Sequence, residues 1–206
     1  VFITAKLPDY IRVGKDDLIE QYIFLQSTHD GTGSIIAAFT PIRVVCANTL
    51  AMALRSMSNK VTIRHTKDAK TKLEQAHKIM GISNLMANEL DVIFNRMAKV
   101  SIVDKDLRKY IETVMLPTQK EQMSQEEFST RFKNTVNSIM SFAVNDPTQQ
   151  VATTQGTVFG AYNAITGYLQ NVKKYKTADD KLDSIMNGND ARLSQKAFDL
   201  ALVLTK

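Results

Sequence analysis

The sequence has no tryptophan, and Cys46 is its only cysteine. A single cysteine excludes an intramolecular disulfide and a zinc site built from four cysteines. No apolar stretch approaches the roughly 20 residues that cross a bilayer, and no signal peptide opens the chain. These absences predict a protein of the reducing cytoplasm that makes no membrane contact.

Apolar and charged residues are present in ordinary globular proportions, at 44% and 23%. A chain of 206 residues with this composition is expected to form its own hydrophobic core. The nine methionines suit a helical core or an adaptable binding face, because the thioether side chain is unbranched and flexible.

The chain carries 26 Lys and Arg against 21 Asp and Glu, which gives a net charge of +5. Residues 1–67 hold 8 basic and 5 acidic side chains, residues 68–146 hold 11 of each, and residues 147–206 hold 7 and 5. The positive excess therefore lies toward both ends of the sequence. A balance of this size permits a polyanionic partner such as nucleic acid but does not require one.

The first third of the sequence is rich in β-prone residues. They form four runs: Phe2–Leu7, Gln21–Thr28, Ser34–Cys46 and Lys60–Thr66. Pro8-Asp9 predicts the end of the first run. The Asp-Gly pair within residues 29–33 predicts a tight hairpin turn between the second and third runs, because glycine supplies the positive φ that such a turn needs.

Apolar residues repeat at helical spacing in the rest of the chain. Asn48 or Thr49 is expected to cap a short helix that follows it. The first long helix is expected to begin near Asp68 and to stop at Gly81. Ser124-Gln125-Glu126-Glu127 is a capping box that predicts the start of a later helix.

Residues 148–157 are polar and uncharged. They predict either a flexible connector or an ordered contact loop, which is followed by a helix at about Val158–Val172. We therefore predict the α+β class, with a small antiparallel sheet and hairpin in the N-terminal third and a helical half after it. The expected organisation is a single unit over 1–206, mainly sheet at 1–67 and mainly helical at 68–206.

Four segments resemble the phage/plasmid-like protein family catalogued as a domain of unknown function. They are residues 39–50 (FTPIRVVCANTL), 63–66 (IRHT), 162–166 (YNAIT) and 191–197 (ARLSQKA). The resemblance implies a mobile-element gene expressed in a prokaryotic cytoplasm, and it implies no reaction. Family members usually carry a stretch before the first strand. Because Val1 lies directly in a β-prone run, we expect the native protein to have residues upstream.

Arg43 and Arg64 form the basic pair of greatest interest, since each lies in a β-prone run beside apolar neighbours. If their strands are adjacent, the two guanidinium groups would line one face and bind phosphates, with Lys60 as a further backbone contact. The alternative is that each arginine pairs with a carboxylate or faces water. For Asn48 and Thr49, helix capping competes with presentation of helix N–H groups to an anion.

Tyr162 and Tyr168 are candidates for stacking on nucleic-acid bases, and core or interface positions are the alternative for both. They lie near small residues that recur every three or four positions and predict a groove open to close packing. The small residues are Gly156, Gly160, Ala164 and Gly167. A helix-interior glycine costs up to about 1 kcal/mol, so a packing partner is expected to compensate.

The three histidines, His29, His65 and His77, show no spacing typical of a metal site. The sequence contains no phosphate-binding glycine loop, no nucleophile elbow and no dinucleotide fingerprint. We therefore expect no cofactor, no metal and no catalytic residue.

Two functions of different kind lead, and an enzyme such as a metal-dependent nuclease is a third hypothesis. The first is a phage- or plasmid-encoded DNA-binding protein that engages single strands in recombination or replication. A sheet with a hairpin followed by a helix is similar to the core of phage single-strand annealing proteins, which is an analogy of fold alone. The alternative is a homo-oligomeric interaction or assembly module that does not bind nucleic acid. The small-residue groove and the methionines motivate this alternative.

Overall fold

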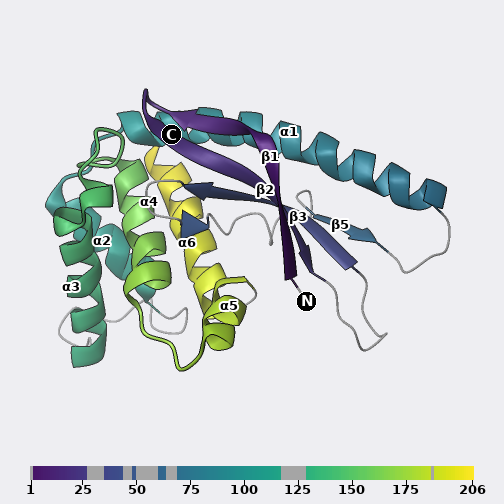
Figure 1. Ribbon diagram of the computed structural model, residues 1–206. Coiled ribbons are helices and arrows are strands. Elements are labelled where there is room, and N and C mark those ends of the chain that lie inside the picture. Colours follow the sequence, from purple (N-terminus) through teal and green to yellow (C-terminus); the bar gives the residue numbers. More distant parts are fainter. Residues whose placement is uncertain are drawn as a thin grey trace. The chain divides into compact units, whose positions relative to one another are not determined.

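The computed structural model describes residues 2–26, 35–43, 48–49, 60–63, 69–116, 129–186 and 188–206. The chain divides into two compact units, Val1–Ile93 and Phe94–Lys206. All described strands lie in the first unit, and the second contains helices (Figure 1). This order confirms the α+β class with an N-terminal antiparallel sheet and a helical half. The expectation of a single domain stays a prediction.

Five strands form one antiparallel sheet. They are β1 (Phe2–Val13), β2 (Asp17–Gln26), β3 (Ile35–Arg43), β4 (Asn48–Thr49) and β5 (Lys60–Ile63). The order is β1-β2-β3-β4, and β5 also pairs with β3. The β2–β3 pairing is the one that the Asp-Gly signal predicts, although the turn residues 29–33 lie outside the described residues.

Strand β1 continues past Pro8, where the sequence predicts that it ends. The register with β2 shifts between Lys6 and Tyr10, which marks a β-bulge. A bulge leaves residues out of the ladder, so the missing N–H of proline costs no hydrogen bond there. The strand then ends at a turn in which Gly14 has a φ of 61°, a conformation that favours glycine.

Helix α1 (Ala69–Lys99) packs on one face of the sheet through its first half. Its Ile79 forms a buried cluster with Ala37 of β3 and Val61 of β5, with Ile82 packed against it. The helix passes through Gly81, so the predicted stop there is wrong. Gly81 is exposed and has no positive φ, and buried positions continue beyond it at helical spacing, so packing carries the helix onward.

The second unit surrounds one helix that is buried along its whole length. That helix is α4, and all ten of its residues are buried. It contacts α2, α3 and α6, and Figure 1 shows it between α3 and α6. Besides the end of α1, the described helices of this unit are α2 (Asp104–Met115), α3 (Thr130–Asn145), a 3-10 turn (Pro147–Gln149), α4 (Val158–Gly167), a π-helical turn (Tyr168–Val172), α5 (Ala178–Met186) and α6 (Asn189–Leu204).

Aromatic rings fill the space around α4. The ring of Phe94 lies 5.3 Å from Phe159 and 6.3 Å from Tyr162, and Tyr162 lies 5.8 Å from Phe198. These separations are typical of aromatic pairs in protein cores. None of the described helices combines the length and the apolar character needed to span a membrane.

Residues 148–157 form an ordered contact loop, one of the two forms that their composition predicts. The loop closes with Gly156 at a φ of 64°, and the amide of Ile102 donates to its carbonyl at 2.9 Å. The Thr154 carbonyl oxygen approaches Gly160 so closely that a Cβ there would lie 1.8 Å from it. The chain's own backbone thus packs against the small residue at position 160.

Helix α3 begins with Ser129, whose Oγ accepts from the amide of Phe132 at 3.2 Å. The predicted capping box at residues 124–127 lies outside the described residues, as does the short helix expected after Thr49. Thr177 is the cap of α5, because its Oγ1 accepts from the Asp180 amide at 3.0 Å.

Candidate nucleic-acid interface

Arg43 ends strand β3 and is fully buried, with 0% of its surface exposed. Its Nε donates to both carboxylate oxygens of Asp17, at 2.9 and 3.0 Å, and its Nη2 donates to Oδ2 at 2.6 Å. Asp17 opens strand β2 and is itself buried. The two residues form a charge-assisted, multiply hydrogen-bonded pair inside the sheet unit.

This pairing corrects the expectation that Arg43 lies on an accessible surface. A phosphate would have to enter the interior and displace the buried Asp17 carboxylate from the Arg43 guanidinium, which is costly. The partner is 26 residues away in the sequence, so local sequence reveals only that Arg43 needs a partner. The alternative of a carboxylate pair is the one that the structure contains.

Of the other residues predicted to contact nucleic acid, some lie in the part of the chain that the structure describes and others lie outside it. Arg64 lies outside the described residues, and Lys60 occupies β5 in register with Ala38. Asn48 and Thr49 form strand β4, paired with Arg43 and Ile42, and the helix they were expected to cap lies outside the described part of the chain.

The two tyrosines occupy the interior and the margin of the helical unit. Tyr162 is fully buried, so it cannot stack on a base, and the prediction of stacking is wrong for this residue. Its hydroxyl has no hydrogen-bond partner among the described residues, and burial raises its pKa above the usual value. Tyr168 is half-buried at the start of the π-helical turn. Tyr162 lies on a helix that is apolar on all sides, which is the sequence signal of a buried helix.

An exposed aromatic residue beside basic groups lies instead on the β1–β2 hairpin. Tyr10 is 45% exposed, and the Lys6 ammonium lies 5.3 Å from the centre of its ring. Lys6 also pairs with Glu20, and the Tyr22 hydroxyl donates to Glu20 at 2.5 Å. Together with Arg12, these residues form what we call the outer hairpin face: Lys6, Tyr10, Arg12, Glu20 and Tyr22.

Hydrogen bonding sets the charge states on this face. The hydrogen bond to Glu20 raises the pKa of Lys6, and the same bond lowers the pKa of Glu20. The hydrogen bond to Glu20 also raises the pKa of Tyr22. Lys6 therefore stays cationic and Glu20 anionic at neutral pH, with the phenol of Tyr22 neutral.

The strand register relates position 60 to the outer hairpin face. Lys60 pairs with Ala38, Ala38 with Phe24, and Phe24 with Thr4, so these positions form one row across the sheet. Alternation along β1 and β2 places Lys6, Tyr10 and Tyr22 on the same side of the sheet as that row. This is the side opposite the cluster of Ala37, Val61 and Ile79 on which α1 packs.

The positive charge of the chain is concentrated around β5 and the start of α1. Residues 55–78 contain seven Lys and Arg and two acidic residues, a net charge of +5. The other 182 residues contain 19 of each sign, since 26 − 7 and 21 − 2 both equal 19. The excess is visible when charges are counted over a 24-residue window of the sequence, and it is hidden when they are counted over thirds of the chain. Lys60 and Arg64 belong to it, and Arg43 does not.

The second unit contains a different polar cluster around the buried carboxylate of Asp190. Lys173 pairs with it at 2.6 Å, Ser184 donates to it at 2.7 Å, and the Tyr175 hydroxyl also donates to it. Burial, followed by this hydrogen bond, raises the pKa of Tyr175. No group of His, Cys, Asp or Glu suited to a metal ion occurs among the residues that the structure describes.

A protein-family comparison gives one match. The family described as a domain of unknown function (DUF932) matches residues 1–191. The match confirms the resemblance to a domain of unknown function, and it covers the first unit and the second unit as far as residue 191. A comparison with curated proteins and one with solved structures each give no match.

Proposed function

We propose that this chain, which belongs to the DUF932 family of domains of unknown function, binds single-stranded nucleic acid in the cytoplasm of a prokaryotic cell. In this proposal a phage or plasmid gene encodes it, and it serves recombination or replication without making or breaking a bond. The binding charges come from the segment that we call the basic stretch, residues 55–78.

The observation that carries the proposal is the +5 charge of the basic stretch in a chain that is otherwise balanced. Clustered Lys and Arg bind phosphates by releasing the counterions condensed on the nucleic acid. Strand β5 and the start of α1 hold part of this stretch, where His77 and Lys78 are exposed. The interior pairing of Arg43 removes a cation from the surface, which leaves the basic stretch as the main source of positive charge in the sheet unit.

The preference for a single strand rests on the outer hairpin face. A base that is free of a duplex stacks on an exposed aromatic ring, and such stacking tolerates any sequence. Tyr10 offers an exposed ring with the ammonium of Lys6 above it, on a rigid strand. Because Lys6 is paired with Glu20, its charge is offset by a carboxylate. The outer hairpin face would therefore supply stacking, and the basic stretch would supply the charge that binds phosphates.

The test is the binding of a fluorescently labelled oligonucleotide, followed by anisotropy over a range of salt concentrations. Single-stranded binding should weaken steeply as salt rises, with each phosphate contact contributing about −0.7 to the slope of log K against log salt. The variant Lys60→Gln/Arg64→Gln/Lys67→Gln should reduce the magnitude of that slope by about 2. Duplex of the same sequence should bind more weakly than the single strand.

A matched triple variant controls for the loss of net charge. Lys105→Gln/Lys174→Gln/Lys176→Gln removes the same number of positive charges, here from exposed residues of the helical unit. It should leave the slope within experimental error of the original protein. Equal losses in the two variants would assign the binding to net charge alone, and no binding at low salt would end the proposal.

A further inference from the structure

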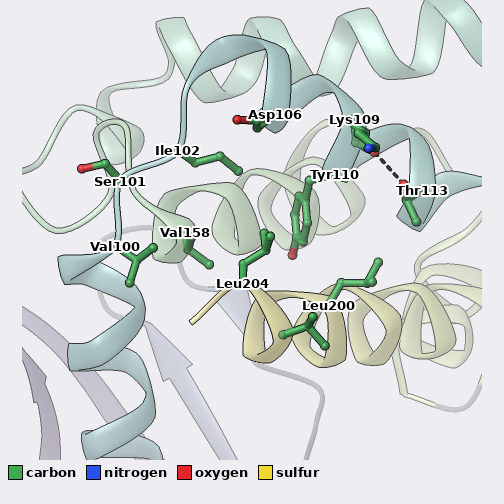
Figure 2. Close-up of a pocket in the computed structure, with 11 residues that line it drawn as sticks. Val100, Ser101, Ile102, Asp106, Lys109, Tyr110, Thr113, Val158, Leu200 and Leu204 are labelled. Atoms are coloured by element: carbon green, nitrogen blue, oxygen red, sulfur yellow. Dashed lines mark hydrogen bonds between the residues drawn. The ribbon is translucent and has the colours of Figure 1, made fainter. Parts of the chain in front are cut away.

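The helical unit contains a cavity of about 310 Å³ that is separate from the proposed nucleic-acid surface. Four parts of the chain form its walls: residues 100–102, helix α2, the first residue of α4 and the last turns of α6. In Figure 2 the side chains of Ile102, Tyr110 and Leu204 point toward the same space, which Val158 also lines. All of these residues belong to the second unit.

The walls are held in place by hydrogen bonds, so the cavity is preformed. Ile102 donates its amide to the Gly156 carbonyl, and Val158 donates its amide to the Val100 carbonyl, both at 2.9 Å. The Tyr110 hydroxyl donates to the Ala197 carbonyl at 2.7 Å, which fixes the ring between α2 and α6. A ligand entering a preformed site loses less free energy to ordering of the protein.

The size and lining of the cavity select a small ligand with an apolar body. An engineered apolar cavity of about 150 Å³ is enough to hold benzene, and this one is roughly twice as large. Aliphatic side chains and the Tyr110 ring supply most of the lining, which suits a phenyl or branched aliphatic group.

The polar end of the ligand is selected by Asp106 and Lys109, which also line the cavity. Both are exposed, and they lie one turn apart on α2, so they face the same side of that helix. Neither side chain forms an ion pair with any residue that the structure describes. The third polar side chain that α2 contributes to the lining is Thr113, and its hydroxyl already donates to the Lys109 carbonyl at 2.7 Å (Figure 2).

From this arrangement we propose that the cavity binds a zwitterionic ligand with an apolar body, of which an apolar α-amino acid is the smallest type. The apolar group fills the space between Ile102, Tyr110 and Leu204. The ligand's ammonium meets Asp106 and its carboxylate meets Lys109. A ligand with only an ammonium group would pair with Asp106 and offer no partner to Lys109. A ligand with only a carboxylate would pair with Lys109 and offer no partner to Asp106.

The test uses three probes that share a phenyl ring: L-phenylalanine, 3-phenylpropionate and 2-phenylethylamine. Each is titrated into the whole chain while backbone amide chemical shifts are recorded by NMR. L-phenylalanine should bind with a dissociation constant of about 1 mM, as expected for a ligand of roughly a dozen heavy atoms. The two singly charged probes should bind about two- to fivefold more weakly, since each lacks one exposed ion pair.

Substitutions test separately how the apolar cavity and the charged residues that line it contribute to binding. Leu204→Trp should fill the cavity and abolish the shifts, and Val144→Trp on the exposed face of α3 should bind as the original protein does. Lys109→Met should remove the preference for L-phenylalanine over 2-phenylethylamine. Unchanged amide positions at about 10 mM L-phenylalanine, or unchanged binding in Leu204→Trp, would overturn the site. Equal affinity for L-phenylalanine and 3-phenylpropionate would overturn the zwitterionic assignment.

Discussion

The two units bury a carboxylate in different ways. In the sheet unit, the carboxylate of Asp17 forms an ion pair with the guanidinium of Arg43, and both residues are almost completely enclosed. In the helical unit, Asp190 accepts from three side chains, and its charged partner Lys173 remains one-third exposed. The first arrangement joins two enclosed charges, whereas the second joins an enclosed carboxylate to neutral donors and a partly hydrated cation.

This difference has consequences for function as well as stability. A fully enclosed arginine is a structural group that joins β2 to β3, and its charge is unavailable to an external ligand. A partly exposed lysine keeps much of its hydration whether or not its partner is ionised. Arg43 and Lys173 are both basic residues in the sequence, yet their roles differ. The difference follows from how completely each ion pair is buried.

The largest expected effect is on the sheet unit. Asp17→Asn should lower the free energy of unfolding by about 3–5 kcal/mol, because it removes the carboxylate charge that pairs with the buried Arg43 guanidinium. Chemical denaturation followed by circular dichroism measures the change. The double variant Asp17→Leu/Arg43→Met should recover most of the loss, since apolar replacements of a buried ion pair are often neutral. A double variant as unstable as Asp17→Asn would show that the pair stabilises by more than mutual neutralisation.

A second comparison contrasts one glycine from each unit. Gly160→Ala should destabilise by about 1–3 kcal/mol, because the new Cβ collides with the Thr154 backbone. Gly81→Ala on α1 meets nothing within 4 Å and should stabilise by about 0.4–1 kcal/mol. Thermal unfolding of both variants checks the opposite signs. A neutral Gly160→Ala would mean that the 148–157 loop yields to the added methyl group.

The same chemical change in the helical unit should have a smaller effect than in the sheet unit. Asp190→Asn should cost about 1–2 kcal/mol, because the neutral amide still occupies the site and Lys173 regains water. The measurement is denaturation under the conditions used for Asp17→Asn. If Asp190→Asn proved at least as costly as Asp17→Asn, the contrast between an enclosed ion pair and a partly hydrated one would be wrong.

The sequence predicts the order of the elements and the β2–β3 hairpin well, because both depend on local patterns. Alternation and an Asp-Gly pair specify the hairpin, and helical periodicity specifies most of the later elements. The two wrong boundaries, at Pro8 and Gly81, share a cause. A bulge accommodates the first and tertiary packing carries the helix through the second, so neither residue ends its element.

The candidate site is harder to predict because burial is a property of the assembled fold. Arg43 and Tyr162 are suitable residue types for binding nucleic acid, yet both are enclosed by residues distant in the sequence. The sequence does not point to Tyr10 as a stacking residue, because the first strand is predicted to end before it. The charge of the basic stretch is visible in the sequence alone, since it needs only a suitable window of residues.

The most direct test of the central claim, that Arg43 supports the sheet and the basic stretch binds nucleic acid, uses one folded variant. The affinity of Asp17→Leu/Arg43→Met for a labelled single-stranded oligonucleotide is measured at low salt beside the original protein. The predicted result is an unchanged affinity, because the pair contributes no accessible charge. A loss as large as that of Lys60→Gln/Arg64→Gln/Lys67→Gln would contradict the claim and return Arg43 to the binding surface.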